Sequence, residues 1–348
     1  MMLAGAQEIL KKARRRAPPP GPESYRSLFI VGLLFPLHIL LGLAAVPLVL
    51  AALFVWRSPW AWALAACYAP LYAQPAHRGS SAVPGWQSTR FARALWRWYD
   101  ASTHCADYFA RFEARLSRWT AARGDGAKQY VVAIHPHGLA IFSRTFWLTG
   151  RVAFLARPWR MIGATALFYI PIVREFTLLF GAVGADRATF EAMLGTGANV
   201  VVYPGGLDEA NDDTASSAIA IRTRKGFVRL AVKHGVDVLP MFCFGELEAV
   251  GAVRPLPRGL SDFLRRKLRV STTLFVGRFG LFVPRRVPFD LCVGAPISVA
   301  KRAPGTPEYD AEVQRVYEAY IAEIAQTFEM HKVACGYANR KLVFSGSG

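Results

Sequence analysis

Two histidines stand two residues apart in the run His135-Pro136-His137-Gly138, directly after the apolar stretch Val131–Ile134. The β-branched stretch favours a strand, and if that strand continued both rings would point to one side, at the sheet edge where open α/β folds bind ligands. Pro136 cannot donate a ladder hydrogen bond and Gly138 permits a sharp turn, so the chain is expected to leave the sheet here. An imidazole at such an edge can act as a general base near neutral pH.

Two other roles for the histidine pair have to be weighed. A His-x-His spacing on a strand can hold a metal ion, but a hydrolytic zinc site needs further ligands. The remaining histidines stand apart, outside any carboxylate-rich cluster: His38, His77, His104, His234 and His331. We therefore expect no metal here, while a purely structural role for both rings stays open.

A second motif, Tyr203-Pro204-Gly205-Gly206-Leu207-Asp208-Glu209, also follows a strand-like run. Its glycines, Gly205 and Gly206, let the backbone approach a substrate and can aim N–H groups at a developing oxyanion. Glu209 adds a carboxylate that we expect near the histidines. The alternative is a plain turn with surface acids. Glu246, after the strand-like stretch 236–243, is a further carboxylate that could orient a base or bind substrate.

Three cations, Arg222, Arg224 and Lys225, precede a helical stretch that opens with Gly226 and Phe227. Cations at a helix N-terminus add to its unpaired N–H groups and to the positive end of the helix dipole. Such a site suits a phosphate-bearing ligand such as coenzyme A. As a bare run of charge the signal is weak.

Composition favours contact with lipid over contact with nucleic acid. The chain has 348 residues, 53% of them hydrophobic, and a formal net charge of +18; its mean hydropathy is +0.23 and its pI about 10.1. This balance suits an anionic membrane, a nucleic acid or a polyphosphorylated substrate. No nucleic-acid-binding signature accompanies the charge, so we expect no nucleic-acid partner. The five cysteines form no CxxC pair and predict neither a disulfide framework nor a zinc site.

The N-terminal third of the chain is predicted to meet a membrane. Residues 1–26 read as a flexible basic arm, and 27–74 as a hairpin of two charge-free segments, Leu28–Trp56 and Trp60–Tyr72. The basic flanks place both ends in the cytosol. A cleaved signal peptide, and a re-entrant path for the short second segment, are the alternatives. Residues 75–127 alternate aromatics with arginines, which predicts interfacial helices or amphipathic helices packed on the enzyme.

From residue 128 to 344 the pattern predicts one α/β catalytic domain. Strand-like runs at 130–134, 199–203, 236–243, 270–276 and 289–293 alternate with helical runs at 188–194 and 226–234. That alternation favours a largely parallel sheet covered by helices. A last helix is expected from Pro307 to about Lys332, with Thr306 as its N-cap.

In this order the motifs resemble the type-2 diacylglycerol acyltransferase family, which also contains monoacylglycerol and wax-alcohol acyltransferases. The matching stretches are His135–Gly138, Ala166–Pro171 with Arg174, Gly205-Gly206 with Glu209, Arg224–Ala231 with His234-Gly235, Pro240, Phe244–Glu246, Gly277-Arg278, Val293–Ile297 and His331-Lys332. They cover about residues 27–344 at the family's spacing. Each motif alone is weak, but together they are highly specific.

The resemblance implies a glycerolipid-acyltransferase-like mixed sheet covered by helices, behind an N-terminal transmembrane or re-entrant hairpin. The implied reaction is acyl-CoA plus diacylglycerol giving triacylglycerol, with acyl-CoA as co-substrate and no cofactor. The enzyme would sit in the endoplasmic reticulum membrane with its catalytic domain facing the cytosol, or at the lipid-droplet surface. Monoacylglycerol and fatty alcohols are the alternative acceptors, and an oligomer is compatible with the sequence.

The resemblance also implies that His137 carries catalysis, with His135 as its neighbour. The wider glycerolipid acyltransferases pair this histidine with an aspartate five residues on, where this chain has Phe142. Glu209 or Glu246 would then orient the imidazole, and we favour Glu209. Arg222, Arg224 and Lys225 would hold the phosphates of coenzyme A, with help from Arg174.

Two further interpretations concern the surface and the activity. Residues 254–286 carry nine Lys or Arg against one acid, Asp262, and could lie on an anionic leaflet or form a solvated loop. A lipid-binding scaffold built on an inactive acyltransferase is the alternative from another functional class. The intact His137, Gly205-Gly206 and Glu209 speak against it.

Overall fold

The computed structural model describes residues 48, 51–55, 57–73, 111–139, 141–148, 152–171, 173–179, 181–206, 209, 218–253, 257, 259–261, 263, 273–278, 280 and 284–346. The predicted basic arm, all but a few residues of the first apolar segment, and residues 264–272 of the basic stretch lie outside this part of the chain.

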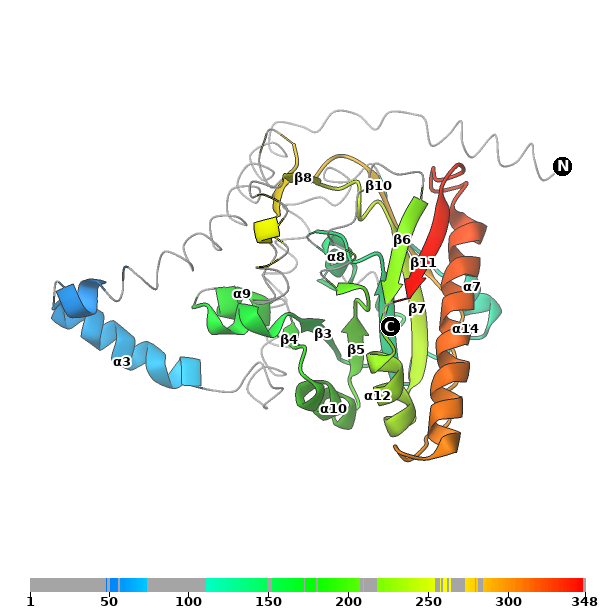
Figure 1. Ribbon diagram of the computed structural model, residues 1–348, viewed down its shortest axis with the longest axis horizontal. Helices are drawn as coiled ribbons and strands as arrows, with labels where there is room; N and C mark the ends of the chain where they lie inside the picture. The colour runs from blue at the N-terminus through cyan, green and yellow to red at the C-terminus, as the bar shows by residue number, and fades with distance from the viewer. Residues whose placement is uncertain are drawn as a thin grey trace.

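A seven-stranded mixed sheet forms the centre of the described structure (Figure 1). Its order is β1 (Arg111–Arg115), β10 (Pro288–Val293), β7 (Asp237–Phe244), β2 (Tyr130–His135), β5 (Asn199–Val202), β3 (Trp159–Gly163) and β4 (Ala182–Gly184). The strands from β7 to β4 are mutually parallel, and β10 pairs antiparallel with β7. Parallel strands therefore predominate, as the alternating sequence pattern predicted.

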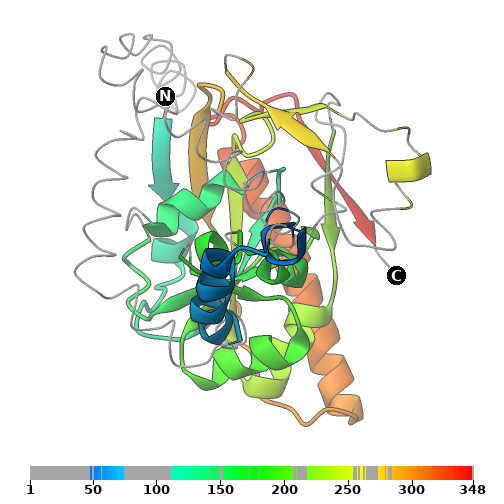
Figure 2. The same ribbon diagram turned by 90° about the vertical axis from the view of Figure 1, so that its left-hand side faces the viewer.

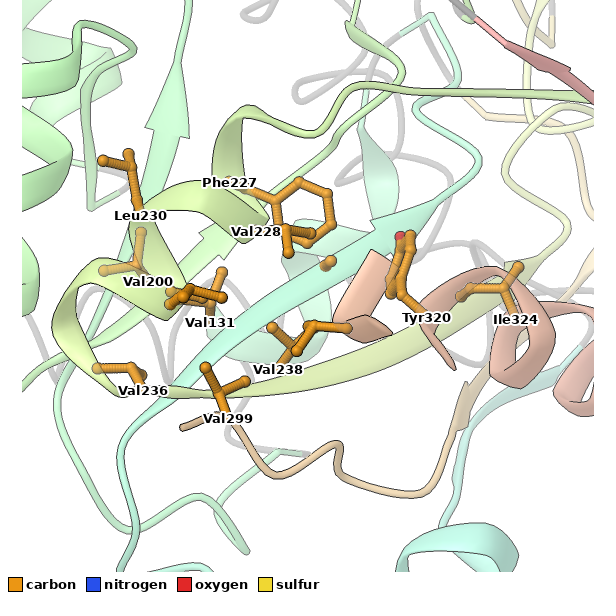
Figure 3. Close-up of a cluster of buried hydrophobic side chains, with 14 of the residues drawn as sticks. Val131, Val200, Phe227, Val228, Leu230, Val236, Val238, Val299, Tyr320 and Ile324 are labelled. Atoms are coloured by element: carbon orange, nitrogen blue, oxygen red, sulfur yellow. The ribbon is translucent and has the colours of Figure 1, made fainter. Parts of the chain in front are cut away.

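Strand β2 divides two hydrophobic cores because its side chains alternate between the faces of the sheet. Val131 and Ala133 belong to one core, and Val132 and Ile134 to the other. The first core lies beneath α10 (Arg187–Gly195), α12 (Gly226–His234) and α14 (Pro307–His331). Figure 3 shows side chains of α12 and α14 over the valines of the sheet. Burial on both faces explains why β2 reads as a continuous apolar run.

The helices begin and end close to where the sequence predicts. Thr306 caps α14, and its hydroxyl accepts a hydrogen bond from the Tyr309 N–H at 3.2 Å. Asp186 caps α10 in the same way through the Thr189 N–H, at 2.9 Å. Gly235 ends α12 with φ +71°, a conformation that suits glycine.

The edge strand β1 lies within residues 75–127, which were predicted to form interfacial helices or amphipathic helices packed on the enzyme; residues 75–110 of that segment lie outside the described part of the chain. Its residues Arg111–Arg115 pair in parallel with β10. The run Arg-Phe-Glu-Ala-Arg has the alternation of a strand, and the Arg115 guanidinium pairs with the buried Asp290 carboxylate at 3.0 Å. The α/β domain therefore starts before residue 128, and the short helix α7 (Ser117–Ala121) follows β1 within it.

Two small sheets lie beside the main one. Strand β6 (Ala218–Thr223) pairs in parallel with the C-terminal strand β11 (Lys341–Gly346), and β8 (Gly251–Val253) pairs antiparallel with β9 (Leu274–Val276). Short helical turns connect the main strands: η3 (Phe142–Arg144), α8 (Thr145–Leu148), η4 (Thr165–Tyr169) and α9 (Val173–Leu179).

The second apolar segment is a helix, α3 (Pro59–Ala73), preceded by the turn η1 (Ala51–Val55). It projects away from the sheet in Figure 1 and faces the viewer in Figure 2. Its outer side chains are exposed, with Trp60 79% and Leu64 72% accessible. Among the described residues, no helix combines the length and the apolar character that crossing a bilayer requires.

Candidate active site

Three motifs that the sequence analysis singled out meet at the carboxyl ends of neighbouring strands. The His135–Gly138 run ends β2, the Tyr203–Glu209 motif follows β5, and Glu246 follows β7. Since β7, β2 and β5 are adjacent and parallel, their carboxyl ends lie at one edge of the sheet. The parallel topology therefore brings together side chains that are up to 111 positions apart in the chain.

The Glu209 carboxylate joins the two histidines without contacting both rings. It accepts a hydrogen bond from His135 Nδ1 at 2.9 Å and from the His137 backbone N–H at 2.7 Å. The Arg222 N–H also donates to it, at 3.3 Å. His135 is 0% and Glu209 1% exposed, so the carboxylate satisfies buried donors and fixes the chain as it leaves β2.

His137 takes its orientation from the backbone. Its Nδ1 lies 2.6 Å from the Gly138 carbonyl oxygen. A carbonyl oxygen can only accept, so Nδ1 carries the proton and Nε2 of the neutral ring presents its lone pair. This is the tautomer that a general base acting through Nε2 requires. The group predicted to orient this ring was Glu209 or Glu246, and the structure gives Gly138 that contact.

The two imidazoles point in different directions because β2 ends at His135. The His135 ring lies 5.9 Å from the ring of Tyr320 on α14, whereas the His137 ring lies 5.6 Å from that of Tyr203. Tyr320 belongs to the first hydrophobic core and Tyr203 to the second. The strand alternation expected to put both rings on one side therefore stops before His137.

Glu246 binds the loop that follows the histidines. Its carboxylate oxygens accept hydrogen bonds from the N–H groups of Phe142, at 2.6 Å, and Ser143, at 2.8 Å. Gly138 packs against the same side chain: a Cβ at this position would lie 2.6 Å from Glu246 Cγ. Gly138 has φ +60°, so both its conformation and its surroundings require glycine.

Burial shifts the proton affinities of this site. Desolvation lowers the pKa of His137, against the raising effects of the Gly138 carbonyl and the Glu209 charge. Burial raises the pKa of Glu246 to about 7, although its bonds to Ser143 and Phe142 oppose that shift. A histidine with a lowered pKa is unprotonated near neutral pH, as a general base must be.

The glycine pair after β5 is placed for close packing and a tight turn. A Cβ on Gly205 would collide with the Glu209 side chain, so only glycine fits there. Gly206 has φ +54°, and its N–H donates to the Tyr203 carbonyl at 3.1 Å. That N–H is already bonded within the turn.

The cations predicted to hold phosphates lie next to the site on β6 and α12. Arg222 is in β6 and donates its N–H to Glu209, while Arg224 is exposed in the turn before the helix. Lys225 Nζ donates to Gln314 at 2.7 Å and lies over the ring of Tyr317. Gly226 opens α12, and Phe227 is buried against Tyr320 in the first core. The backbone of β6 therefore contacts Glu209 at Arg222, and Arg224 and Lys225 follow two and three residues later in the chain.

Arg174 lies elsewhere, where α9 meets the apolar helix α3. It is 3% exposed, pairs with Glu175 at 2.7 Å and lies over the ring of Tyr72, 5.4 Å from its centroid. Tyr72 also donates its hydroxyl to the Tyr169 carbonyl at 2.8 Å. These contacts connect α3 to α9 and η4 of the α/β domain.

Sequence reasoning gave no role to Ser143 or Tyr203. The Ser143 hydroxyl lies 2.8 Å from that of Tyr203, and both side chains are buried. Tyr203 could have been found as a polar tip at the end of a buried strand, since buried tyrosine hydroxyls usually bond to a partner. Ser143 stands between Phe142 and Arg144, where neither its type nor its spacing gives a signal. Within the part of the chain that the structure describes, no group of three His, Cys, Asp or Glu side chains is arranged to hold a metal ion.

Known proteins similar to this chain are lipid acyltransferases. A family model described as "Diacylglycerol acyltransferase" matches residues 69–345. The chain is 31% identical to human 2-acylglycerol O-acyltransferase 3 over 231 residues, 60% of this chain and 66% of that protein. It is 28% identical to mouse acyl-CoA wax alcohol acyltransferase 2, over 60% and 67% of the two chains, and 28% identical to Dictyostelium discoideum diacylglycerol O-acyltransferase 2, over 69% and 74%.

These alignments span about two thirds of the length of the relatives. A crystal structure of 1-acyl-sn-glycerophosphate acyltransferase from Thermotoga maritima aligns with 63% of this chain and 72% of its own, at 17% identity and a TM-score of 0.37.

Proposed function

The chain belongs to the diacylglycerol acyltransferase family, and from that premise we propose that it moves a fatty acyl group from acyl-CoA to the free hydroxyl of diacylglycerol, giving triacylglycerol. The family membership agrees with the resemblance seen in the sequence motifs. The observation that carries the proposal is the tautomer of His137, whose Nδ1–H bond to Gly138 leaves Nε2 as a base at the carboxyl edge of the sheet.

In the proposed reaction His137 Nε2 removes the proton of the acceptor hydroxyl as its oxygen attacks the thioester carbonyl of acyl-CoA. The carbon–oxygen bond forms and the carbonyl electrons move onto oxygen. The tetrahedral intermediate then breaks its carbon–sulfur bond, and the imidazolium returns the proton to the leaving thiolate of coenzyme A. No covalent acyl-enzyme is needed, because the imidazole shifts one proton in each direction.

Backbone groups near Gly138 stabilise the developing oxyanion in this proposal. Glu209 holds the chain on one side of the base, since it accepts the His137 N–H and the His135 ring. Arg222, Arg224 and Lys225 bind the phosphates of coenzyme A, a role supported by their position between Glu209 and the start of α12.

Monoacylglycerol and fatty alcohols are the alternative acceptors. Relatives at comparable identity bear the names 2-acylglycerol O-acyltransferase and wax alcohol acyltransferase. The three acceptors share a primary or secondary hydroxyl on an apolar molecule, and the proposed chemistry at His137 is the same for each.

The membrane context belongs to the same proposal. The charge-free helix α3 exposes Trp60, Trp62 and Leu64, which supports contact with lipid. The family premise and the mixed sheet support a glycerolipid-acyltransferase-like domain held at the cytosolic face of the endoplasmic reticulum, or at a lipid droplet, by the N-terminal hairpin. The tether between α3 and Arg174 would keep the domain close to that surface.

The test uses the full chain in detergent or liposomes with labelled acyl-CoA and separate diacylglycerol, monoacylglycerol and fatty-alcohol acceptors. We expect labelled triacylglycerol from diacylglycerol at the highest rate. A higher rate with another acceptor would move the assignment to that substrate. Absence of product with every acceptor, from protein that still binds acyl-CoA, would contradict the proposal and favour a lipid-binding scaffold.

A further inference from the structure

The ring of Tyr203 packs against the ring of His137. It is the first residue after β5, is 6% exposed, and its ring meets the His137 ring edge to face, with 5.6 Å between centroids and 75° between planes. Edge-to-face contact is a favoured arrangement of aromatic rings. His137 is therefore held at one side by the Gly138 carbonyl and at another by an aromatic ring.

The Tyr203 hydroxyl is fixed in turn by Ser143. The two hydroxyl oxygens are 2.8 Å apart, and Ser143 is 0% exposed. Because Ser143 lies on η3 and Tyr203 follows β5, the bond ties the loop after β2 to the neighbouring strand. A hydroxyl pair buried at this depth restrains both side chains more than an exposed pair would.

Glu246 holds both ends of the loop after β2. It accepts the N–H groups of Phe142 and Ser143 at one end of the loop and packs against Gly138 at the other. Between them Ile141 has φ +52°, a conformation that a β-branched residue rarely adopts unless its surroundings impose it. The contacts run in a closed circle from His137 through Tyr203, Ser143, Glu246 and Gly138 back to His137.

We propose that Tyr203 is a positioning residue for the acyl transfer, which keeps the His137 ring aimed at the acceptor hydroxyl, and that Ser143 holds Tyr203 in place from the loop clamped by Glu246. This inference rests on the proposed function of His137. Neither Tyr203 nor Ser143 needs to touch substrate. A general base must keep its lone pair in line with the proton it takes, so a ring free to turn loses rate and leaves substrate affinity unchanged.

The experiment compares Y203F, S143A, the double variant and Y203L in the full chain. Y203F and S143A break the same hydroxyl pair, so each should lower kcat by about 3–10-fold and the double variant should be no worse than either. Y203L removes the aromatic ring that contacts His137. It should lower kcat by about 100-fold while the KM for acyl-CoA stays near the wild-type value. Y309F is the matched control, because it removes a buried tyrosine hydroxyl that bonds the Arg229 carbonyl on α12; its kcat should not change.

A second readout needs no turnover. Diethyl pyrocarbonate modifies unprotonated imidazole, and peptide mass spectrometry separates an adduct on His137 from one on the buried His135. His137 should react faster in Y203L than in the wild type, and at an unchanged rate in Y309F.

Wild-type kcat together with an unchanged His137 modification rate in Y203L would overturn the inference, as would Y203F and S143A effects that multiply in the double variant. If the wild type transfers no acyl group at all, the proposed function fails. The modification rates would still decide whether Tyr203 holds the ring.

Discussion

The Glu209 carboxylate lies 2.9 Å from the Nδ1 atom of His135, and both side chains are buried. The same carboxylate accepts the backbone N–H groups of His137 and Arg222. It joins the chain leaving β2 to the motif after β5 and to the strand β6. Its contacts thus fix the backbone that carries His137, while Gly138 orients the ring.

Removing this acceptor is expected to cost both stability and rate. E209A leaves three donors without their acceptor, and buried unsatisfied groups cost about 1–3 kcal/mol each, so we expect a loss of about 3 kcal/mol or more. The kcat should fall more than tenfold as the loop loosens. E191A is the control, since Glu191 forms partly exposed ion pairs with Arg187 and Lys233; it should cost less than about 1 kcal/mol. Urea unfolding of the purified variants measures both losses of stability. Equal losses of stability in E209A and E191A would contradict this role for Glu209.

Gly138 should tolerate no side chain. In G138A the methyl group would meet the Glu246 side chain at 2.6 Å, in addition to the strain of φ +60°. G206A carries a similar strain at φ +54° but has no atom within 4 Å of its Cβ. The left-handed conformation costs about 1–2 kcal/mol in both, and overpacking adds about 1–3 kcal/mol in G138A alone. Thermal unfolding of the two variants measures the difference; a G206A that is as unstable as G138A would show that the contact with Glu246 is unimportant.

Glu246 should make the protein less stable as the pH rises towards neutrality. Its pKa is raised by burial from the ordinary 4.5 to about 7, so between these values the native state binds the proton that the unfolded chain has lost. The free energy of unfolding then falls as pH rises through this window, by about 3 kcal/mol in total. E246Q cannot ionise and should show a flatter dependence between pH 5 and 7.5. E191Q should keep the wild-type slope, because ion pairs with Lys233 and Arg187 lower the pKa of Glu191 to about 2, outside the window. Parallel curves for wild type and E246Q would contradict the assignment.

The cations before α12 should act on acyl-CoA binding. R224Q combined with K225Q removes two positive charges beside the start of the helix, so the KM for acyl-CoA should rise about 5–50-fold with kcat little changed. K233Q is the matched control, since Lys233 lies at the other end of the same helix in an ion pair with Glu191. The difference between the variants should shrink at high salt. An unchanged KM for acyl-CoA in the double variant would show that Arg224 and Lys225 do not bind coenzyme A.

The sequence was informative wherever one element decides its own structure. Helix α12 matches the prediction residue for residue, and α14 begins at Pro307 behind its Thr306 cap, because apolar periodicity and capping are local signals. Strands β2, β5, β7 and β10 were visible as short, mostly apolar runs. Strand β1 was missed, since the arginines and aromatics of the segment around it also suit a helix at a membrane surface.

Side-chain pairing in the site could not be read in the same way. The sequence predicted that Glu209 and Glu246 lie near the histidines. Which groups these carboxylates bind depends on where β2 ends and how the following loop turns. His135 and His137 would lie on the same face of the sheet only if β2 continued through His137. The strand ends at His135, so the two rings lie on different sides. The Gly138 carbonyl and the Ser143–Tyr203 bond arise from loop conformation, for which neither residue type nor spacing gives a signal.

The role of His137 is tested most directly by the rate of acyl transfer from labelled acyl-CoA to diacylglycerol in H137A beside H135A. Loss of a general base lowers kcat by about 10²–10⁴-fold, which is the result expected for H137A with membrane association and acyl-CoA binding intact. H135A should retain measurable transfer, because its ring supports Glu209 and does not act as the base. An H137A variant that keeps most of the wild-type rate would contradict the account.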